Sequence, residues 1–124
     1  RHFTVSGALT ALSSVAPSDA VGLLKEELDA DGGSGFSFAD LLADRAGTTL
    51  AWVSTRDEAR ARAMQDRLAA GVRVDEVFPR ADGLPEGVPD AELQARYGGV
   101  GGRGYRHVAE DVERRVAACP AYRD

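Results

Sequence analysis

Apolar side chains recur along most of this chain at intervals of three and four residues, which is the spacing of one face of an α-helix. The first such segment spans residues 2–16 and ends at Pro17, because a proline ring clashes with a continuing helix. A second predicted helix covers residues 20–28. The glycines of residues 31–35 then predict a tight turn.

The longest predicted helix begins after Ser37 and runs to Val53. Ser37 and Asp40 form a capping-box pattern, in which the serine side chain accepts a hydrogen bond from the third helical residue. Gly47 lies inside this helix at a cost of ~1 kcal/mol relative to alanine, so we expect another helix to cross there. Three aromatic residues of this region are expected in the core: Phe36, Phe38 and Trp52.

Charged and flexible segments follow. Thr55 and Glu58 form a second capping-box pattern, which predicts a helix that ends before Gly71. Residues 72–77 carry three valines and are expected to be extended. Residues 79–89 are rich in proline and glycine and are expected to run over the surface.

In the last third of the chain, the sequence pattern predicts two helices joined by glycines. Residues 90–97 form a short helical pattern, and residues 98–104 contain five glycines. A glycine run can hold phosphate, but this one lacks the Lys-Ser/Thr of a P-loop, so we interpret it as a linker. Residues 105–118 form an amphipathic helix. Its predicted inner face consists of Val108, Val112 and Val116.

These elements predict a mainly α fold: a small single-domain bundle of about five helices with a helix–glycine turn–helix hairpin at its centre. A chain of 124 residues is long enough to bury a core in one domain. We expect residues 1–70 to form the helical core and residues 71–104 to form a Pro/Gly-rich connection with a short helix. Residues 105–118 supply the C-terminal helix.

Charge and composition narrow the classes of function. The net charge of −5, without a basic stripe, argues against nucleic-acid binding. The single cysteine, Cys119, excludes an internal disulfide and a cysteine zinc cluster. No apolar run approaches the ~20 residues that span a bilayer, so we predict no transmembrane segment in this chain. The chain opens with Arg1 rather than Met, which suggests that a signal or anchor segment was removed before it.

Acidic residues gather around the predicted turn and give the first candidate site. Asp40 and Asp44 lie one turn apart on one helix face, and Glu26 belongs to the preceding helix. If the turn folds the helices antiparallel, these carboxylates converge, with His2 or Lys25 as counter-charge. Paired carboxylates can perform general acid–base chemistry, including glycoside hydrolysis. The candidate catalytic residues are therefore Glu26, Asp40, Asp44 and His2, although helix capping and solvation explain the same acids more simply.

Residues 29–40 also resemble an EF-hand calcium loop. Acidic residues occupy its first, third and twelfth positions, and helices are predicted on both sides. The Ca²⁺ ligands would be Asp29, Asp31, the Gly35 carbonyl, Ser37 and Asp40. Ser34 stands where the sharp turn calls for glycine, and aspartate replaces the longer glutamate at the last position. Any calcium binding is therefore expected to be weak.

Several spaced motifs occur in order within about the first 50 residues. They are His2-Phe3 with Ser6 and Leu9, Lys25-Glu26 with Asp29, Gly33-Ser34-Gly35, Phe36-Ser37-Phe38, Asp40-Leu41, and Asp44 with Ala46-Gly47. This series resembles the YfiM family of small predicted bacterial envelope lipoproteins. It is also faintly similar to the VanZ-like membrane proteins.

The resemblance implies an α-helical protein of the periplasm or cell envelope, and it supplies no catalytic residues. Three hypotheses follow from it and from the residues themselves. The first is a structural or interaction role, with another envelope protein or peptidoglycan as partner. The second is a small carboxylate-dependent hydrolase acting on envelope polysaccharide, and the third is a calcium-binding module.

Overall fold

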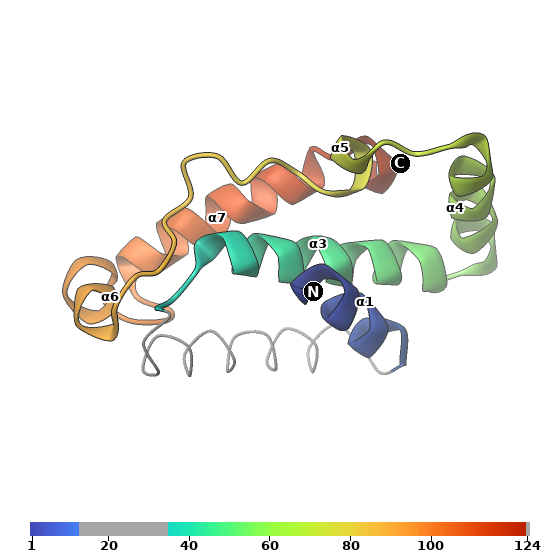
Figure 1. The fold of residues 1–124 in the computed structure, drawn as a ribbon. Coiled ribbons are helices and arrows are strands. Elements are labelled where there is room, and N and C mark those ends of the chain that lie inside the picture. Colours follow the sequence, from blue (N-terminus) through green and yellow to red (C-terminus); the bar gives the residue numbers. More distant parts are fainter. Residues whose placement is uncertain (13–34, 124) are drawn as a thin grey trace.

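The structure is a computed structural model that describes residues 1–12 and 35–123, and within these ranges it is helical without a sheet (Figure 1). The helices are α1 (His2–Leu12), α3 (Phe38–Thr55), α4 (Glu58–Ala70), α5 (Val74–Val77), α6 (Asp90–Tyr97) and α7 (Arg103–Ala117), followed by the 3₁₀ turn η1 (Pro120–Tyr122). The prediction of a mainly α fold is confirmed. The predicted helix of residues 20–28, most of the glycine turn and hence the central hairpin lie outside the described residues.

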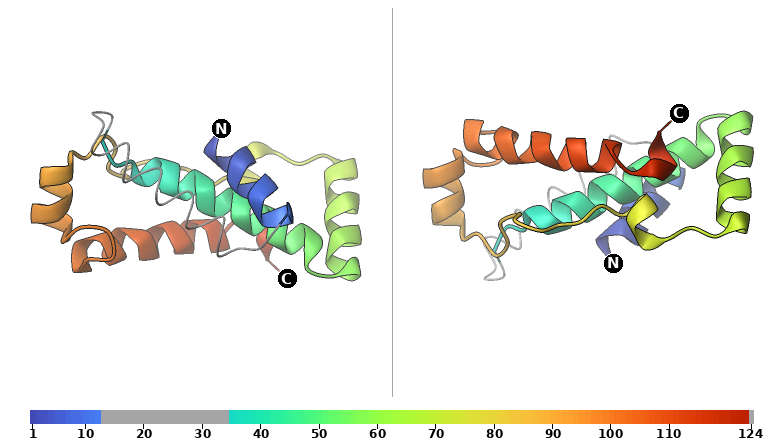
Figure 2. Two further views of the ribbon diagram at one scale, coloured as in Figure 1. Left: turned by 90° about the horizontal axis from the view of Figure 1, so that it is seen from below. Right: turned by 90° about the horizontal axis from the view of Figure 1, so that it is seen from above.

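Helix α3 is the element against which most of the others lie. α1 crosses it on one side, α7 runs beside it on another, and α4 stands across its C-terminal end (Figures 1 and 2). The predicted cap of α3 is confirmed, since the Ser37 hydroxyl accepts a hydrogen bond from the Asp40 amide at 3.1 Å. An ion pair of 2.5 Å between Arg45 and Glu113 ties α3 to α7.

Two glycines allow α1 and α3 to approach closely. A Cβ atom built on Gly47 would lie 2.0 Å from the carbonyl oxygen of Phe3, and one built on Gly7 would lie 3.2 Å from the carbonyl oxygen of Gly47. No side chain fits in the first of these spaces. The expectation that another helix crosses α3 at Gly47 is therefore confirmed, and the crossing helix is α1.

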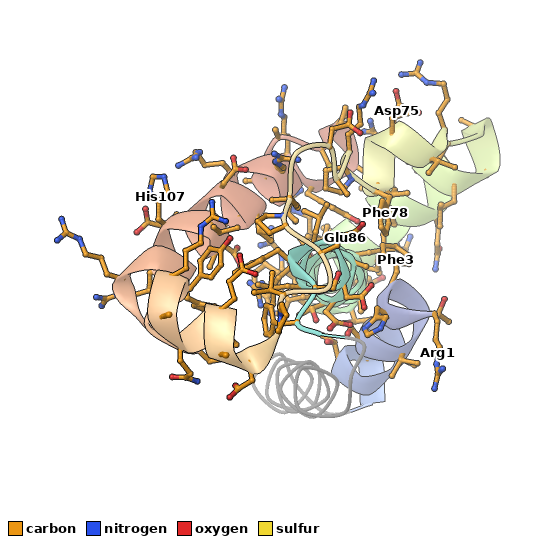
Figure 3. The ribbon with its side chains drawn as sticks, turned by 60° about the vertical axis from the view of Figure 1, so that its left-hand side comes forward. Arg1, Phe3, Asp75, Phe78, Glu86 and His107 are labelled. Atoms are coloured by element: carbon orange, nitrogen blue, oxygen red, sulfur yellow. The ribbon has the colours of Figure 1, made fainter. Side chains whose placement is uncertain are left out.

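Aromatic rings fill the core at the start of α3. Phe36 and Phe38 are fully buried and pack against Tyr105 with ring centroids 5.8 and 5.7 Å away. Phe3 of α1 faces Phe78, with centroids 5.6 Å apart (Figure 3). The prediction that Trp52 also lies in the core is wrong, because its side chain remains 44% exposed and is covered by the guanidinium of Arg56 at 4.5 Å.

The predicted start of α4 is corrected by two residues. Thr55 belongs to the end of α3, where its hydroxyl donates to the Ala51 carbonyl oxygen. Asp57 is the cap instead, because its carboxylate accepts from the Arg60 amide at 2.8 Å. The helix ends before Gly71, as predicted.

The valines of residues 72–77 do not form an extended segment. Val74–Val77 is the short helix α5, which places Asp75 and Glu76 in its first turn. The Glu76 carboxylate accepts from the Arg73 amide at 2.9 Å and pairs with the Arg67 side chain at 3.0 Å. These local contacts satisfy the backbone where a lone strand would have no partner.

Residues 79–89 do more than run over the surface. Leu84 and Val88 are buried, and Val88 exchanges two backbone hydrogen bonds of 2.8 and 2.9 Å with Phe36. This segment, which we call the strap, therefore closes the core at the start of α3. The Arg115 side chain holds it from α7 by donating to the carbonyl oxygens of Arg80 and Asp82.

The glycine run of residues 98–104 is a packed junction rather than the linker we expected. Helix α6 ends where predicted, but α7 begins at Arg103, inside the run. A Cβ on Gly102 would lie 2.4 Å from the Tyr97 carbonyl oxygen, and one on Gly104 would lie 2.8 Å from the Tyr97 Cα atom. Glycine is needed here because the start of α7 packs directly on the end of α6. The valines predicted to face inward do so, with Val112 and Val116 buried and Val108 partly buried against the core.

Candidate functional site

The first residues of α1 lie over the first turns of α3, where two aspartates stand one turn apart. The Nδ1 atom of His2 lies 3.2 Å from Asp44 Oδ1, and its Nε2 atom lies 3.3 Å from Asp40 Oδ2. Both ring nitrogens therefore face carboxylates. A protonated imidazole satisfies this arrangement, since it donates from both nitrogens.

Asp44 is the buried member of this group. Its side chain is 5% exposed, whereas that of Asp40 is 41% exposed. The Ser6 hydroxyl donates to Asp44 Oδ1 at 2.7 Å, and His2 approaches both carboxylate oxygens of Asp44. A buried carboxylate is costly unless it is hydrogen-bonded, so α1 supplies the partners that make burial of Asp44 possible.

The hydroxyls of α1 extend this polar contact along the helix. Thr10 is buried and donates to the Ser6 carbonyl oxygen at 2.8 Å. His2, Ser6 and Thr10 follow one another at intervals of four residues, so they share one face of α1. We call His2, Ser6, Asp40 and Asp44 the α1–α3 clasp.

The structure brings together three of the four residues proposed for catalysis. His2, Asp40 and Asp44 are in contact, while Glu26 lies outside the described residues, as does Lys25. Ser6 was missed as a site residue, although its spacing of four from His2 matches the spacing of Asp44 from Asp40. Two such pairs on facing helices can form a four-residue contact. The matching spacing was therefore the sequence feature from which Ser6 could have been predicted.

The geometry of the clasp does not provide an activated nucleophile. The Ser6 hydroxyl donates to Asp44 rather than to a histidine nitrogen, so the clasp lacks the Ser–His pair that activates a serine nucleophile. Both nitrogens of His2 are engaged, which leaves no free base for a substrate. Three cavities lined by described residues lie along α6 and α7 and include none of the clasp residues.

The described part of the proposed calcium loop is engaged in other contacts. The Ser37 hydroxyl caps α3, and Asp40 pairs with His2. Gly35 is buried, and Asp29 and Asp31 lie outside the described residues. Among residues 1–12 and 35–123, no group of three or more His, Cys, Asp and Glu side chains is placed to hold a metal ion.

No helix in the described ranges is both long enough and apolar enough to cross a membrane. On α7, Asp111 accepts from Arg115 and Arg114, and the hydrogen bond from Arg115 is the main reason that the pKa of Asp111 lies below its ordinary value. This charged group belongs to the attachment of the strap rather than to the clasp.

Comparison of the chain with protein families, with curated protein sequences and with solved structures found no match.

Proposed function

We propose that this protein is a bacterial cell-envelope protein with a structural or interaction role, in which the α1–α3 clasp fixes the helical scaffold. The observation that carries the proposal is the buried Asp44 carboxylate, whose partners His2 and Ser6 both come from α1. This contact set uses the polar atoms of the clasp to join two helices.

The residues that resemble the YfiM family support a packing role. Those on α1 are His2, Phe3 and Ser6, and those on α3 include Asp40, Asp44 and Gly47. These residues meet at the crossing of the two helices. A motif made of mutually contacting residues specifies how two helices pack, which suits a scaffold better than an enzyme.

Exposed apolar side chains supply contact area for a partner. Within residues 1–12 and 35–123, four large ones are at least 44% exposed: Val5, Trp52, Leu68 and Val74. Trp52 and Arg56 form a stacked cation–aromatic pair on the surface of α3. Such pairs suit recognition of another envelope protein or of peptidoglycan, because aromatic and arginine side chains are enriched at binding interfaces.

A peptidoglycan assay separates this proposal from the hydrolase alternative. Purified sacculi are incubated with the protein, and both the pelleted protein and the soluble fragments are measured. We expect no release of fragments above the buffer control. Release that is abolished by Asp40→Asn, in a variant that melts like the wild type, would instead establish the hydrolase and overturn the structural role.

Cell fractionation tests the location. The natural full-length protein, carrying an epitope tag, is expressed in its own host and followed through envelope and cytoplasmic fractions. The proposal expects recovery with the envelope or the periplasm. Recovery with a cytoplasmic marker enzyme contradicts the envelope assignment whatever the outcome of the peptidoglycan assay.

A further inference from the structure

A cavity of about 670 Å³ opens between the end of α6 and the first turns of α7. Its lining includes Arg96, Tyr97, Arg103, Arg106, His107 and Glu110. This volume falls within the range of small-molecule sites, ~300–1,000 Å³. A neighbouring cavity of about 390 Å³ shares Arg96, Tyr97 and His107 with it and reaches the strap at Leu84. Because they share these residues, the two cavities form one groove. Helix α6, which lines both, lies at the end of the molecule remote from α4 (Figure 1).

The groove collects positive charge in a chain whose net charge is −5. Most arginines of the described ranges lie beside a carboxylate: Arg45, Arg56, Arg62, Arg67, Arg73, Arg80, Arg96, Arg114 and Arg115. Arg103 and Arg106 have no ion-pair partner within these ranges. They stand three residues apart in the first turn of α7. Among the residues that the structure describes, the groove contains two carboxylates, Glu110 and Asp111, and Asp111 is paired with Arg114 and Arg115.

The groups around the two arginines also favour a negatively charged ligand. Gly102 provides no side chain to cap α7, so the positive end of this 15-residue helix adds to the field of the two arginines. His107 stands on α7 on the α6 side of the molecule (Figure 3). Tyr97 is 5% exposed and contributes an aromatic wall beneath Arg96, whose guanidinium lies 5.4 Å from its ring. An anion with an attached organic group matches this combination of cationic rim and aromatic wall.

We propose that this groove binds a phosphate-bearing small molecule, with Arg103 and Arg106 holding the phosphate and Tyr97 contacting the organic part. Arginine is suited to this role because its planar fork donates two parallel hydrogen bonds to phosphate oxygens. Glycine at positions 102 and 104 is what allows the arginines of α7 to stand beside Arg96, since α7 packs on α6 without intervening side chains. The site is independent of the α1–α3 clasp.

Amide NMR of the full chain tests the proposal. The ¹⁵N-labelled protein is titrated with inorganic phosphate, inorganic pyrophosphate and glycerol 3-phosphate at constant ionic strength. We expect saturable shifts centred on Gly98, Gly102, Gly104 and His107, with the amides of α4 unchanged. Sodium acetate at the same ionic strength serves as the control anion and is expected to leave these signals in place.

Paired variants identify the arginines. Arg103→Gln with Arg106→Gln should weaken binding by about tenfold or more, because it removes two charge-assisted contacts to phosphate. Arg62→Gln with Arg73→Gln removes the same charge from exposed positions in the half of the chain that carries α4 and should leave the affinity within about twofold. Arg106→Lys keeps the charge without the planar fork and should give an intermediate loss.

The outcomes separate the sources of the phosphate. Binding of the soluble esters assigns the groove to a soluble ligand. Co-sedimentation with phosphatidylglycerol vesicles but not with phosphatidylcholine vesicles, without soluble-ester binding, assigns the same phosphate chemistry to a lipid headgroup. Equal shifts with acetate, equal losses in the two double variants, or no saturable shift with any phosphate compound would overturn the proposal. None of these results depends on the peptidoglycan or fractionation assays.

Discussion

Replacing Gly47 by alanine measures how closely α1 is held against α3. The new Cβ atom would lie 2.0 Å from the carbonyl oxygen of Phe3 and 2.8 Å from its carbonyl carbon. Carbon–oxygen contacts in proteins are seldom closer than ~3.3 Å, so α1 has to move by about 1.3 Å. Backbone atoms form this contact, and no side-chain rotation can relieve it.

The expected loss of stability follows from that displacement. Alanine gains ~1 kcal/mol over glycine in helix propensity. Overpacking costs ~1–3 kcal/mol. The same movement stretches the 2.7 Å hydrogen bond from Ser6 to Asp44 beyond hydrogen-bonding distance, and loss of a bond to a buried carboxylate costs ~1.5–3 kcal/mol. The net expectation is a loss of about 1.5–5 kcal/mol, which for a domain of this size lowers Tm by roughly 10 °C.

Thermal and urea unfolding followed by far-ultraviolet circular dichroism provide the assay. Gly7→Ala is the matched control, because it adds the same methyl group to the same crossing but meets the Gly47 carbonyl oxygen at 3.2 Å. A shift of a few tenths of an ångström accommodates it, so its stability should stay within ~1 kcal/mol of the wild type. A Gly47→Ala protein that melts at or above the wild-type temperature refutes the close crossing of α1 and α3.

Three further predictions concern the clasp, the calcium loop and the C-terminal turn. Asp44→Asn should reduce the free energy of unfolding by ~1.5–3 kcal/mol in urea, and Asp40→Asn by less than ~1 kcal/mol, because only Asp44 is buried; equal losses would contradict the different roles. Millimolar CaCl₂ should leave Tm unchanged, since Ser37 and Asp40 are already engaged, whereas a rise reversed by chelation would support the loop of residues 29–40. Burial raises the pKa of Tyr122 above that of an unfolded tyrosine. The stability that its neutral hydroxyl contributes is therefore fully present below about pH 10 and is lost as the pH rises above that value. In Tyr122→Phe, the free energy of unfolding measured in urea should fall less steeply above pH 10 than in the wild type. An unchanged dependence on pH would contradict this role of Tyr122.

The features of the fold that follow local rules were predictable from the sequence. Ser37 caps α3 because its side chain and the Asp40 amide are three residues apart, and no distant residue is needed for that contact. The bounds of α6 follow in the same way from Pro89 before it and Gly98 after it. The crossing at Gly47 could be expected because an unfavourable residue in a long helix calls for a packing reason, although its partner could not be named.

Features that depend on competition between neighbours were not predictable. Thr55 and Asp57 are both good caps, and the extra turn of α3 decided between them. The strap contributes Leu84 and Val88 to the core because Phe36 offers a backbone partner, which the proline and glycine content of residues 79–89 does not reveal. Trp52 finds a partner in Arg56 one turn later and so needs no place in the core.

The site was predictable in part. Asp40 and Asp44 share a helix face by their spacing, and His2 was one of two cations proposed to meet them. The choice of His2 depends on where α1 crosses α3, which is a tertiary property. The arginine-lined groove escaped notice because its walls come from two helices joined by glycines that resembled a linker, and because ion pairing elsewhere is what makes Arg103 and Arg106 distinctive.

The position of Tyr122 has a consequence for the order in which parts of the chain can fold during synthesis. Its hydroxyl reaches the carbonyl oxygens of Ala46 and Val77, while the neighbouring Gly47 receives α1. Helix α3 is thus contacted at adjacent residues by segments from opposite extremes of the described sequence. During synthesis on the ribosome, α1 can dock as soon as α3 emerges, but the other flank stays uncovered until residue 122 has been added. Nascent chains stalled before that point should therefore be cut by protease near the C-terminal half of α3, and chains released after it should resist.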